Sequence, residues 1–262
     1  MEPTLEEVKG WALEAGKLLR QGLNHKHEIR HKGAIDLVTE MDGRSEKLLI
    51  EKIHNSFPKD RIISEESGDL GGDGGRCWYI DPLDGTTNYA HGVPYFNVSI
   101  GYAVDGRPTL GVVYEPVRRE CFSAQRGEGA WLNRKRIHAS EATELLQSLL
   151  VTGFPYEQTE AFEQNMRSFD HMVRLTQGVR RCGSAALDLC YTACGRFDGY
   201  WERGLKPWDI AAGVVIAEEA GIRVTDLEGS PEYFKPPYSL AGANPVLYPK
   251  LLKELGAVLA HR

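Results

Sequence analysis

Residues 78–88 read WYIDPLDGTTN and join the end of a buried strand to the start of a helix. The aromatic and β-branched residues predict the strand, and the chain is expected to turn at Asp81 and Asp84, where a proline and an Asp-Gly pair interrupt the apolar pattern. Gly85 lets the backbone approach a ligand closely, and Thr86 stands where the free N–H groups of a helix start would face an anion. This composition is typical of a metal-dependent phosphate site.

Two further acidic motifs strengthen this interpretation, since an Asp-Gly turn beside a threonine cap is common on its own. Residues 62–67 (IISEES) place Glu65 and Glu66 directly after an apolar run, and residues 206–213 (KPWDIAAG) place Asp209 in the first turn of an apolar helix. A single Asp there is usually only a favourable charge on the helix dipole. Three acidic motifs, each at the end of an apolar element, predict one shared site.

These motifs resemble the inositol monophosphatase family of magnesium-dependent, lithium-sensitive phosphatases. Residues 78–88 and 208–213 match the two signature blocks of that family, and the Glu65-Glu66 pair precedes them at the expected place. The resemblance spans nearly the whole chain, from residues 36–42 to the last helix. It implies an α+β protein folded as an αβαβα layered sandwich of the sugar-phosphatase type. The implied enzyme is an inositol-1-monophosphatase, a Mg²⁺-dependent phosphomonoesterase that releases inositol and phosphate from myo-inositol monophosphate.

The resemblance also assigns metal ligands. Glu65, Asp81 and the carbonyl of Leu83 are expected to hold a first ion, whose bound water attacks phosphorus. Asp81, Asp84 and Asp209 are expected to hold a second ion, which shields the leaving ester oxygen. Because these ligands are hard oxygens without Cys or His, they favour Mg²⁺, with Mn²⁺ as a substitute, over zinc. Two or three Mg²⁺ ions are the expected cofactors.

Water activation is assigned to Glu65 and to Thr86, with Thr86 hydrogen-bonded to Asp42. The amides of Gly85 and Thr86 are expected to receive phosphate oxygens. Glu202 precedes Asp209 at the spacing at which inositol phosphatases place an acid that accepts a substrate hydroxyl. The substrate is thus expected to contact Glu65, Leu83, Asp84, Gly85, Thr86, Gly183, Ser184, Ala185, Glu202 and Asp209.

Two segments near the motifs carry weaker signals. Lys32 is a candidate for a third metal site or its water, although the segment from Lys32 to Asp42 is shorter than in animal relatives. The glycine-rich residues 68–75 lack the Gly-Lys-Ser/Thr sequence of a phosphate-binding P-loop. We therefore predict that they form a mobile loop beside the site.

Composition bounds the class of protein. The chain has 262 residues, 42% of them hydrophobic, and a net charge of −6, which suffices for a large core and gives no basic face for nucleic acid. No signal peptide or membrane-length apolar run is apparent, and the five cysteines are scattered, so a cytoplasmic protein with reduced thiols is expected. A homodimer without membrane contact is expected.

The two halves of the chain differ in their patterns, and we predict one compact unit with a soft division. Residues 1–145 carry most of the metal ligands, and residues 146–262 carry Glu202 and Asp209. Helices are predicted at residues 5–19, 42–57, 156–176, 184–189, 207–220 and 245–260. Strands are predicted at residues 97–104, 109–114, 121–132, 148–152, 197–201, 222–227 and 239–243, with Glu202 at a strand end.

Other functions remain open at this stage. Relatives with the same metal ligands hydrolyse fructose 1,6-bisphosphate, histidinol phosphate or 3′-phosphoadenosine 5′-phosphate. A dual-specificity sugar phosphatase is also open, since a second phosphate would find cations in Arg180, Arg181, Arg203 and Lys206. Glu202 favours the inositol substrate. A non-enzymatic alternative is a regulatory protein that binds the transcription machinery, as some bacterial relatives do, although no surface in the sequence supports it.

Overall fold

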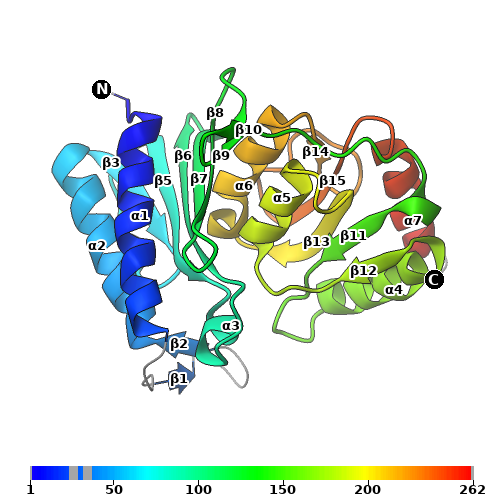
Figure 1. The fold of residues 1–262 in the computed structure, drawn as a ribbon, viewed down its shortest axis with the longest axis horizontal. Helices are drawn as coiled ribbons and strands as arrows, with labels where there is room; N and C mark the ends of the chain where they lie inside the picture. The colour runs from blue at the N-terminus through cyan, green and yellow to red at the C-terminus, as the bar shows by residue number, and fades with distance from the viewer. Residues whose placement is uncertain (1, 24–28, 32–36, 261–262) are drawn as a thin grey trace.

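The computed structural model describes residues 2–23, 29–31 and 37–260. Lys32 lies outside these residues. Two sheets stand side by side, with one pair of helices between them and another pair on each outer face (Figure 1). The layers therefore alternate as αβαβα, which confirms the predicted α+β sandwich.

The first helical layer comprises α1 (Leu5–Gly22) and α2 (Glu40–Ser56). Both helices bury an apolar stripe against the first sheet, as their sequence periodicity predicts. The start of α2 is fixed by a capping box, because Oδ2 of Asp42 accepts hydrogen bonds of 2.8 Å from the Thr39 N–H and 2.7 Å from its hydroxyl. The short strands β1 (Ile29–His31) and β2 (Leu37–Thr39) pair just before this cap.

The first sheet has the order β10-β9-β8-β7-β6-β5-β3-β4. Its central hairpin turns at Asp105 and Gly106, whose φ angles of 50° and 77° are the positive values that a tight hairpin turn requires. The strands are β3 (Asp60–Ser64), β4 (Gly68–Asp69), β5 (Asp73–Asp84), β6 (Asn97–Val104), β7 (Arg107–Glu115), β8 (Glu120–Gln125), β9 (Ala130–Leu132) and β10 (Lys135–Arg136). The helix α3 (Thr86–Ala90) follows β5 directly.

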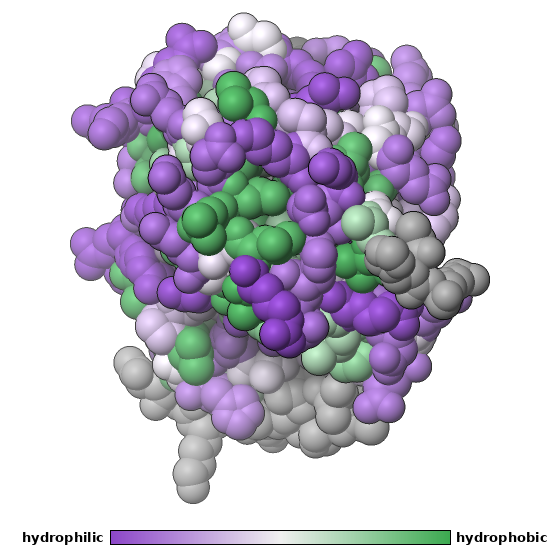
Figure 2. All heavy atoms as spheres, turned by 90° about the vertical axis from the view of Figure 1, so that its right-hand side faces the viewer, coloured by the Kyte–Doolittle hydropathy of each residue, from purple (hydrophilic) through white to green (hydrophobic). Residues whose placement is uncertain are grey.

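The second sheet has the order β12-β11-β13-β15-β14 and begins after the 3₁₀ turn η1 (Leu145–Gln147). Its strands are β11 (Leu149–Thr152), β12 (Gly178–Arg180), β13 (Gly199–Leu205), β14 (Arg223–Thr225) and β15 (Tyr238–Ala243). Its outer face is covered by α4 (Glu160–Leu175) and α7 (Tyr248–Ala260) (Figure 1). The surface on this side is mostly hydrophilic, with apolar side chains gathered near its middle (Figure 2). The predicted division at residue 145 falls between the sheets and stays a prediction.

The middle layer comprises α5 (Ala185–Ala193) and α6 (Pro207–Glu219). Glycines on the first sheet let α6 approach its strands closely. A Cβ atom at Gly101 would lie 2.5 Å from the Cβ of Ala211, and one at Gly111 would lie 2.3 Å from the carbonyl oxygen of Ala212. A helix from the second half of the chain is therefore seated directly on the sheet of the first half.

Three local predictions were wrong. The strand expected to end before Asp81 continues through Asp84 as β5, with an irregular register between these two residues. The glycine-rich segment is not a loop beside the site, because it supplies β4 and the start of β5 in the first sheet. The strand expected to end at Glu202 continues to Leu205 as β13, and Glu202 is buried within it.

Most other elements appear where they were predicted, with ends shifted by a few residues, and α4 begins later than expected. Within the described part of the chain, no helix combines the length and the apolar character needed to cross a membrane.

Candidate active site

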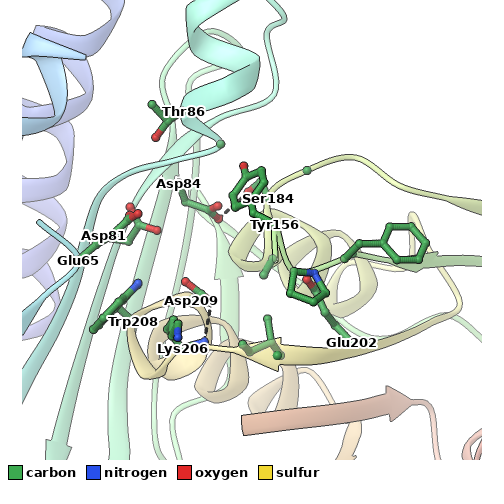
Figure 3. Close-up of a pocket in the computed structure, with 18 of the residues that line it drawn as sticks. Glu65, Asp81, Asp84, Thr86, Tyr156, Ser184, Glu202, Lys206, Trp208 and Asp209 are labelled. Atoms are coloured by element: carbon green, nitrogen blue, oxygen red, sulfur yellow. Dashed lines mark hydrogen bonds between the residues drawn. The ribbon is translucent and has the colours of Figure 1, made fainter. Parts of the chain in front are cut away.

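A cavity of about 450 Å³ opens where the two sheets and the middle helices meet. Figure 3 shows acidic side chains along one side of it and Glu202 on another. The lining includes nearly every site residue predicted from the sequence: Glu65, Asp81, Leu83, Asp84, Gly85, Thr86, Gly183, Ser184, Ala185, Glu202 and Asp209. The structure therefore brings together motifs that lie far apart in the sequence.

The acidic side of the cavity is built from three elements. Glu65 follows β3, Asp81 and Asp84 lie at the end of β5, and Asp209 lies in the first turn of α6. β3 and β5 are parallel neighbours, so their carboxyl ends meet at the same sheet edge. The close seating of α6 on this sheet brings Asp209 to the same place (Figure 3).

Burial and mutual repulsion disfavour the charged forms of these acids. Burial raises the pKa of Asp81 well above its ordinary value, and the charges of Glu65, Asp84 and Asp209 raise it further, as does a hydrogen bond with the Glu65 carboxyl. Burial likewise raises the pKa of Asp209, against a hydrogen bond from the Lys206 N–H that lowers it. Burial and neighbouring carboxylates therefore favour the protonated forms of Asp81 and Asp209, two members of the acid cluster that we define as Glu65, Asp81, Asp84 and Asp209.

Asp84 is held by three donors on one oxygen. Its Oδ2 accepts hydrogen bonds from the Ser184 hydroxyl at 2.6 Å, the Asn97 amide at 3.0 Å and the Ala186 N–H at 3.0 Å. Burial raises the pKa of Asp84 to about 6, although these hydrogen bonds oppose the shift. Because all three donors address Oδ2, the other oxygen, Oδ1, remains available to a ligand.

The Thr86 hydroxyl lies between two acceptors, Oδ1 of Asp42 and the carbonyl oxygen of Leu83, each at 3.0 Å. The predicted contact between Thr86 and Asp42 is thus confirmed. Asp42 is fully buried and does not line the cavity, so it reaches a ligand only through Thr86. Burial raises the pKa of Asp42, against hydrogen bonds from Thr39 and Thr86 that lower it.

The backbone at Gly85 depends on glycine. Its φ is 91°, and a Cβ atom there would lie 2.9 Å from the carbonyl oxygen of Tyr95. Any other residue would meet both backbone strain and a collision. The turn between Asp84 and Thr86 therefore keeps its shape only with glycine at this position.

The donor set suits a hard divalent cation. Glu65, Asp81, Asp84 and Asp209 offer only carboxylate oxygens, and their repulsion would be relieved by positive charge. In the described ranges, no three His, Cys, Asp or Glu side chains already stand close enough together to hold an ion.

Glu202 stands across the cavity from the acid cluster, on β13. Only 8% of it is exposed, and its Oε2 accepts a 2.9 Å hydrogen bond from the hydroxyl of Tyr200. Burial raises the pKa of Glu202 to about 7, while that hydrogen bond and the charge of Arg181 lower it. Glu202 thus belongs to the cavity without joining the acid cluster.

The four basic residues considered for a second phosphate are placed differently from one another. Arg181 and Lys206 line the cavity, whereas Arg180 and Arg203 do not. Arg203 is buried, and its Nη1 donates to Asn165 at 3.3 Å and to Ser168 at 3.4 Å. Two of the four cations are therefore in position to meet a bound anion.

One wall of the cavity was not predicted from the sequence. Gly153, Phe154, Pro155, Tyr156, Glu157 and Thr159 line it. These residues follow β11. Their position after the carboxyl end of a predicted strand could have identified them, because ligand contacts in α/β folds are found at such strand ends. The hydroxyls of Tyr156 and Thr87 lie 3.3 Å apart, which links this wall to α3. Asn97, which holds Asp84, was also missed.

Comparison with known proteins gives consistent matches. A family model described as "Inositol monophosphatase family" matches residues 1–260. The chain is similar to an inositol-1-monophosphatase of Synechocystis, with 52% identity over 88% of this chain and 81% of that protein. It is also similar to the Nus factor SuhB of Pasteurella multocida, with 43% identity over 97% and 95%. The solved structure of an inositol monophosphatase from Anabaena superposes with a TM-score of 0.88 at 44% identity, covering 97% of this chain and 95% of that one.

Proposed function

Since the chain belongs to the inositol monophosphatase family of phosphatases, we propose that it hydrolyses myo-inositol monophosphate to inositol and phosphate in a Mg²⁺-dependent reaction. The observation that carries the proposal is the acid cluster of Glu65, Asp81, Asp84 and Asp209 on one side of a single cavity. Buried carboxylates that raise one another's pKa values need cations before a phosphate can approach. Glu202 on another side supplies the contact for the sugar.

Glu65, Asp81 and the Leu83 carbonyl would hold one ion, and Asp81, Asp84 and Asp209 would hold another. When bound, these cations neutralise phosphate charge, lower the pKa of water and stabilise the leaving oxygen. Lithium would inhibit by occupying one of these positions, as the resemblance implies.

The proton from the attacking water would leave through Thr86. As Oγ1 of Thr86 accepts that proton, its own hydroxyl proton passes to Oδ1 of Asp42 at 3.0 Å. The raised pKa of Asp42 makes it a stronger base than an ordinary aspartate. The water oxygen would form its bond to phosphorus while the ester bond to the inositol oxygen breaks. That oxygen would take a proton from a solvent water, and Asp42 would return its proton to solvent through Thr86.

The remaining predicted contacts would orient the substrate. The turn at Gly85 and Thr86 would face the phosphate, and Gly183, Ser184 and Ala185 would face the sugar, since all five line the cavity. The carboxylate of Glu202 would accept a hydrogen bond from a sugar hydroxyl. The hydroxyl-bearing side of the substrate is thereby distinguished from the phosphate side.

Phosphate release from inositol 1-phosphate, fructose 1,6-bisphosphate and histidinol phosphate tests this proposal, each with Mg²⁺ and with excess chelator. We expect the highest kcat/KM on inositol 1-phosphate and no turnover with chelator. Full activity in chelator would refute the Mg²⁺ requirement. A higher kcat/KM on fructose 1,6-bisphosphate would instead indicate a bisphosphatase, in which Arg181 and Lys206 of the cavity lining would bind the second phosphate.

The relatives named Nus factor favour a second candidate, binding to the transcription machinery. We also propose that the protein is a homodimer and that it is cytoplasmic. The five cysteines form no disulfide, which agrees with a reducing compartment. A pull-down with Asp84→Asn protein separates the two functions. If the Asp84→Asn protein binds transcription proteins but has no turnover, the two functions are independent. If neither the wild-type protein nor the Asp84→Asn protein binds transcription proteins, catalysis is the one function that the experiment supports.

A further inference from the structure

The carboxyl group of Glu202 lies against the backbone of Gly153, the first residue after β11. A Cβ atom at Gly153 would lie 2.2 Å from Oε1, 2.4 Å from Cδ and 2.4 Å from Oε2 of Glu202. Its three nearest neighbours would therefore all belong to this one carboxyl group. The space that a side chain at residue 153 would take is the space that the Glu202 carboxyl uses.

The backbone does not itself require glycine at residue 153. Gly153 is not among the residues of positive φ, so another residue would meet no conformational strain there. Nor is the backbone free to retreat, because the Gly153 carbonyl accepts a 2.8 Å hydrogen bond from the buried amide of Asn165 on α4. The Thr152 hydroxyl also binds the Trp201 carbonyl at 2.6 Å, which ties this strand end to β13.

Tyr200 constrains the same carboxyl group from within β13. Tyr200 is fully buried, and its hydroxyl donates to Oε2 of Glu202 at 2.9 Å. Residues 200 and 202 share one face of the strand, so the tyrosine stands beside the acid that it binds. With Oε2 engaged, Oε1 is the oxygen left to accept a hydrogen bond from a ligand in the cavity.

We propose that Gly153 and Tyr200 are positioning residues that together set the Glu202 carboxyl in the cavity wall, so that the enzyme prefers phosphate esters that carry a hydroxyl within reach of this carboxyl. The proposal rests on the proposed function, which makes Glu202 a hydroxyl acceptor. Because Gly153 has no side chain, the space beside it is open to the Glu202 carboxyl. Because the Tyr200 hydroxyl binds Oε2, the other oxygen, Oε1, is the one that faces the substrate.

Gly153→Ala is the first test, with kcat and KM measured on inositol 1-phosphate and on phenyl phosphate, which carries no hydroxyl. We expect kcat/KM on inositol 1-phosphate to fall roughly ten- to hundredfold, the scale of one charged hydrogen bond, while phenyl phosphate hydrolysis changes little. Gly256→Ala is the matched control, because a Cβ atom at this helical glycine meets nothing within 4 Å. Equal losses on both substrates, or no loss on either, would overturn the proposal.

Tyr200→Phe tests the second residue, with Tyr248→Phe as its control. Tyr248 is also buried and exchanges a 2.6 Å hydrogen bond with the Thr225 hydroxyl, away from the cavity. We expect Tyr200→Phe to raise KM for inositol 1-phosphate and to shift the pH profile of kcat/KM for that substrate alone. The same changes in Tyr248→Phe, or none in Tyr200→Phe, would overturn the role of Tyr200.

A thermal unfolding cycle tests the Gly153 contact without any turnover. Gly153→Ala should lower Tm in the wild-type background and lower it much less in a Glu202→Ala background, where the colliding carboxyl is absent. Equal losses in both backgrounds would overturn the contact. An inactive wild-type protein would refute the proposed function, whereas this cycle would still report on Gly153 and Glu202.

Discussion

The hydroxyl of Ser184 donates a 2.6 Å hydrogen bond to Oδ2 of Asp84 and thereby joins the N-terminus of α5 to the end of β5. The same oxygen of Ser184 accepts hydrogen bonds from the Asn97 amide at 2.8 Å and from the Leu187 N–H at 3.3 Å. The hydroxyl that caps the helix therefore also orients an acid of the cavity. Asn97 completes this arrangement, since it donates to both Asp84 and Ser184.

Replacing Asn97 with alanine should weaken Mg²⁺ binding. The change removes one donor from Asp84 and one from Ser184, and loss of a group that orients a metal ligand typically costs about 10- to 100-fold in affinity. Isothermal titration with Mg²⁺ measures the effect directly. Ser123→Ala is the control, because the Ser123 hydroxyl is buried without a hydrogen-bond partner. Unchanged affinity in Asn97→Ala would show that Ser184 and Ala186 suffice to hold Asp84.

Asp84→Asn should keep the fold and lose most of the turnover. The substitution preserves size but removes a charge from the acid cluster, and a loss on the order of a hundredfold or more is expected when one electrostatic contact to a transition state disappears. Single-substrate kinetics with circular dichroism as a check on folding measures this. Activity close to wild type would show that Asp84 does not act in the reaction.

Glu202→Gln should separate recognition from chemistry. The amide can no longer accept a charged hydrogen bond from a substrate hydroxyl, so kcat/KM on inositol 1-phosphate should fall roughly ten- to hundredfold. Small phosphate esters without that hydroxyl should be hydrolysed as before. Losses of the same size on both kinds of substrate would instead place Glu202 within the structural or metal-binding framework.

The metal-free protein should become less stable as pH rises from about 5 to about 8. The pKa is raised to about 6 at Asp84 and to about 7 at Glu202, so the folded state holds protons that the unfolded chain has already released. Where the folded state binds more protons, the free energy of unfolding falls with increasing pH. Thermal unfolding in chelator measures the decline, and added Mg²⁺ should raise Tm most at pH 8. A Tm in chelator that rises over this range would contradict the prediction.

Gly101→Ala should destabilise the protein, because the new methyl group would collide with Ala211 at the seat of α6. Overpacking of this kind typically costs about 1–3 kcal/mol. Urea denaturation measures it. Gly10→Ala is the matched control, since the same methyl group meets nothing within 4 Å on α1. The control should be neutral or stabilising by about 0.5–1 kcal/mol, because alanine favours a helix.

The acids of the cavity could be predicted from the sequence because each stands in a motif. Asp81 and Asp84 share one corner with the glycine that shapes it, and Asp209 follows a proline that marks a helix start. The layered fold followed from the resemblance, since periodicity predicts single elements and gives no information on how they stack. Strand ends were less accurate at Asp81, because a proline in a strand with irregular register looks like a turn.

Gly153 and Asn97 could not be recognised from the sequence, because their roles depend on partners brought close only by folding. Asn97 opens an apolar strand and Gly153 follows one, and neither position carries a chemical pattern of its own. The burial of Glu202 was missed for the same reason, since the continuation of β13 depends on pairing with β15. Local sequence patterns identified the acidic residues of the site but not the residues that position them.

The close seating of α6 allows hydrolysis and substrate choice to diverge independently. Asp209 belongs by sequence to the second half of the chain, yet Ala211 and Ala212 anchor its helix on Gly101 and Gly111 of the first sheet. Glu202 stands instead on the second sheet. Substitutions that shift or reshape the second sheet can therefore alter which ester fits while the acid cluster stays assembled. One ancestral scaffold can keep its hydrolytic chemistry as its descendants acquire new substrates.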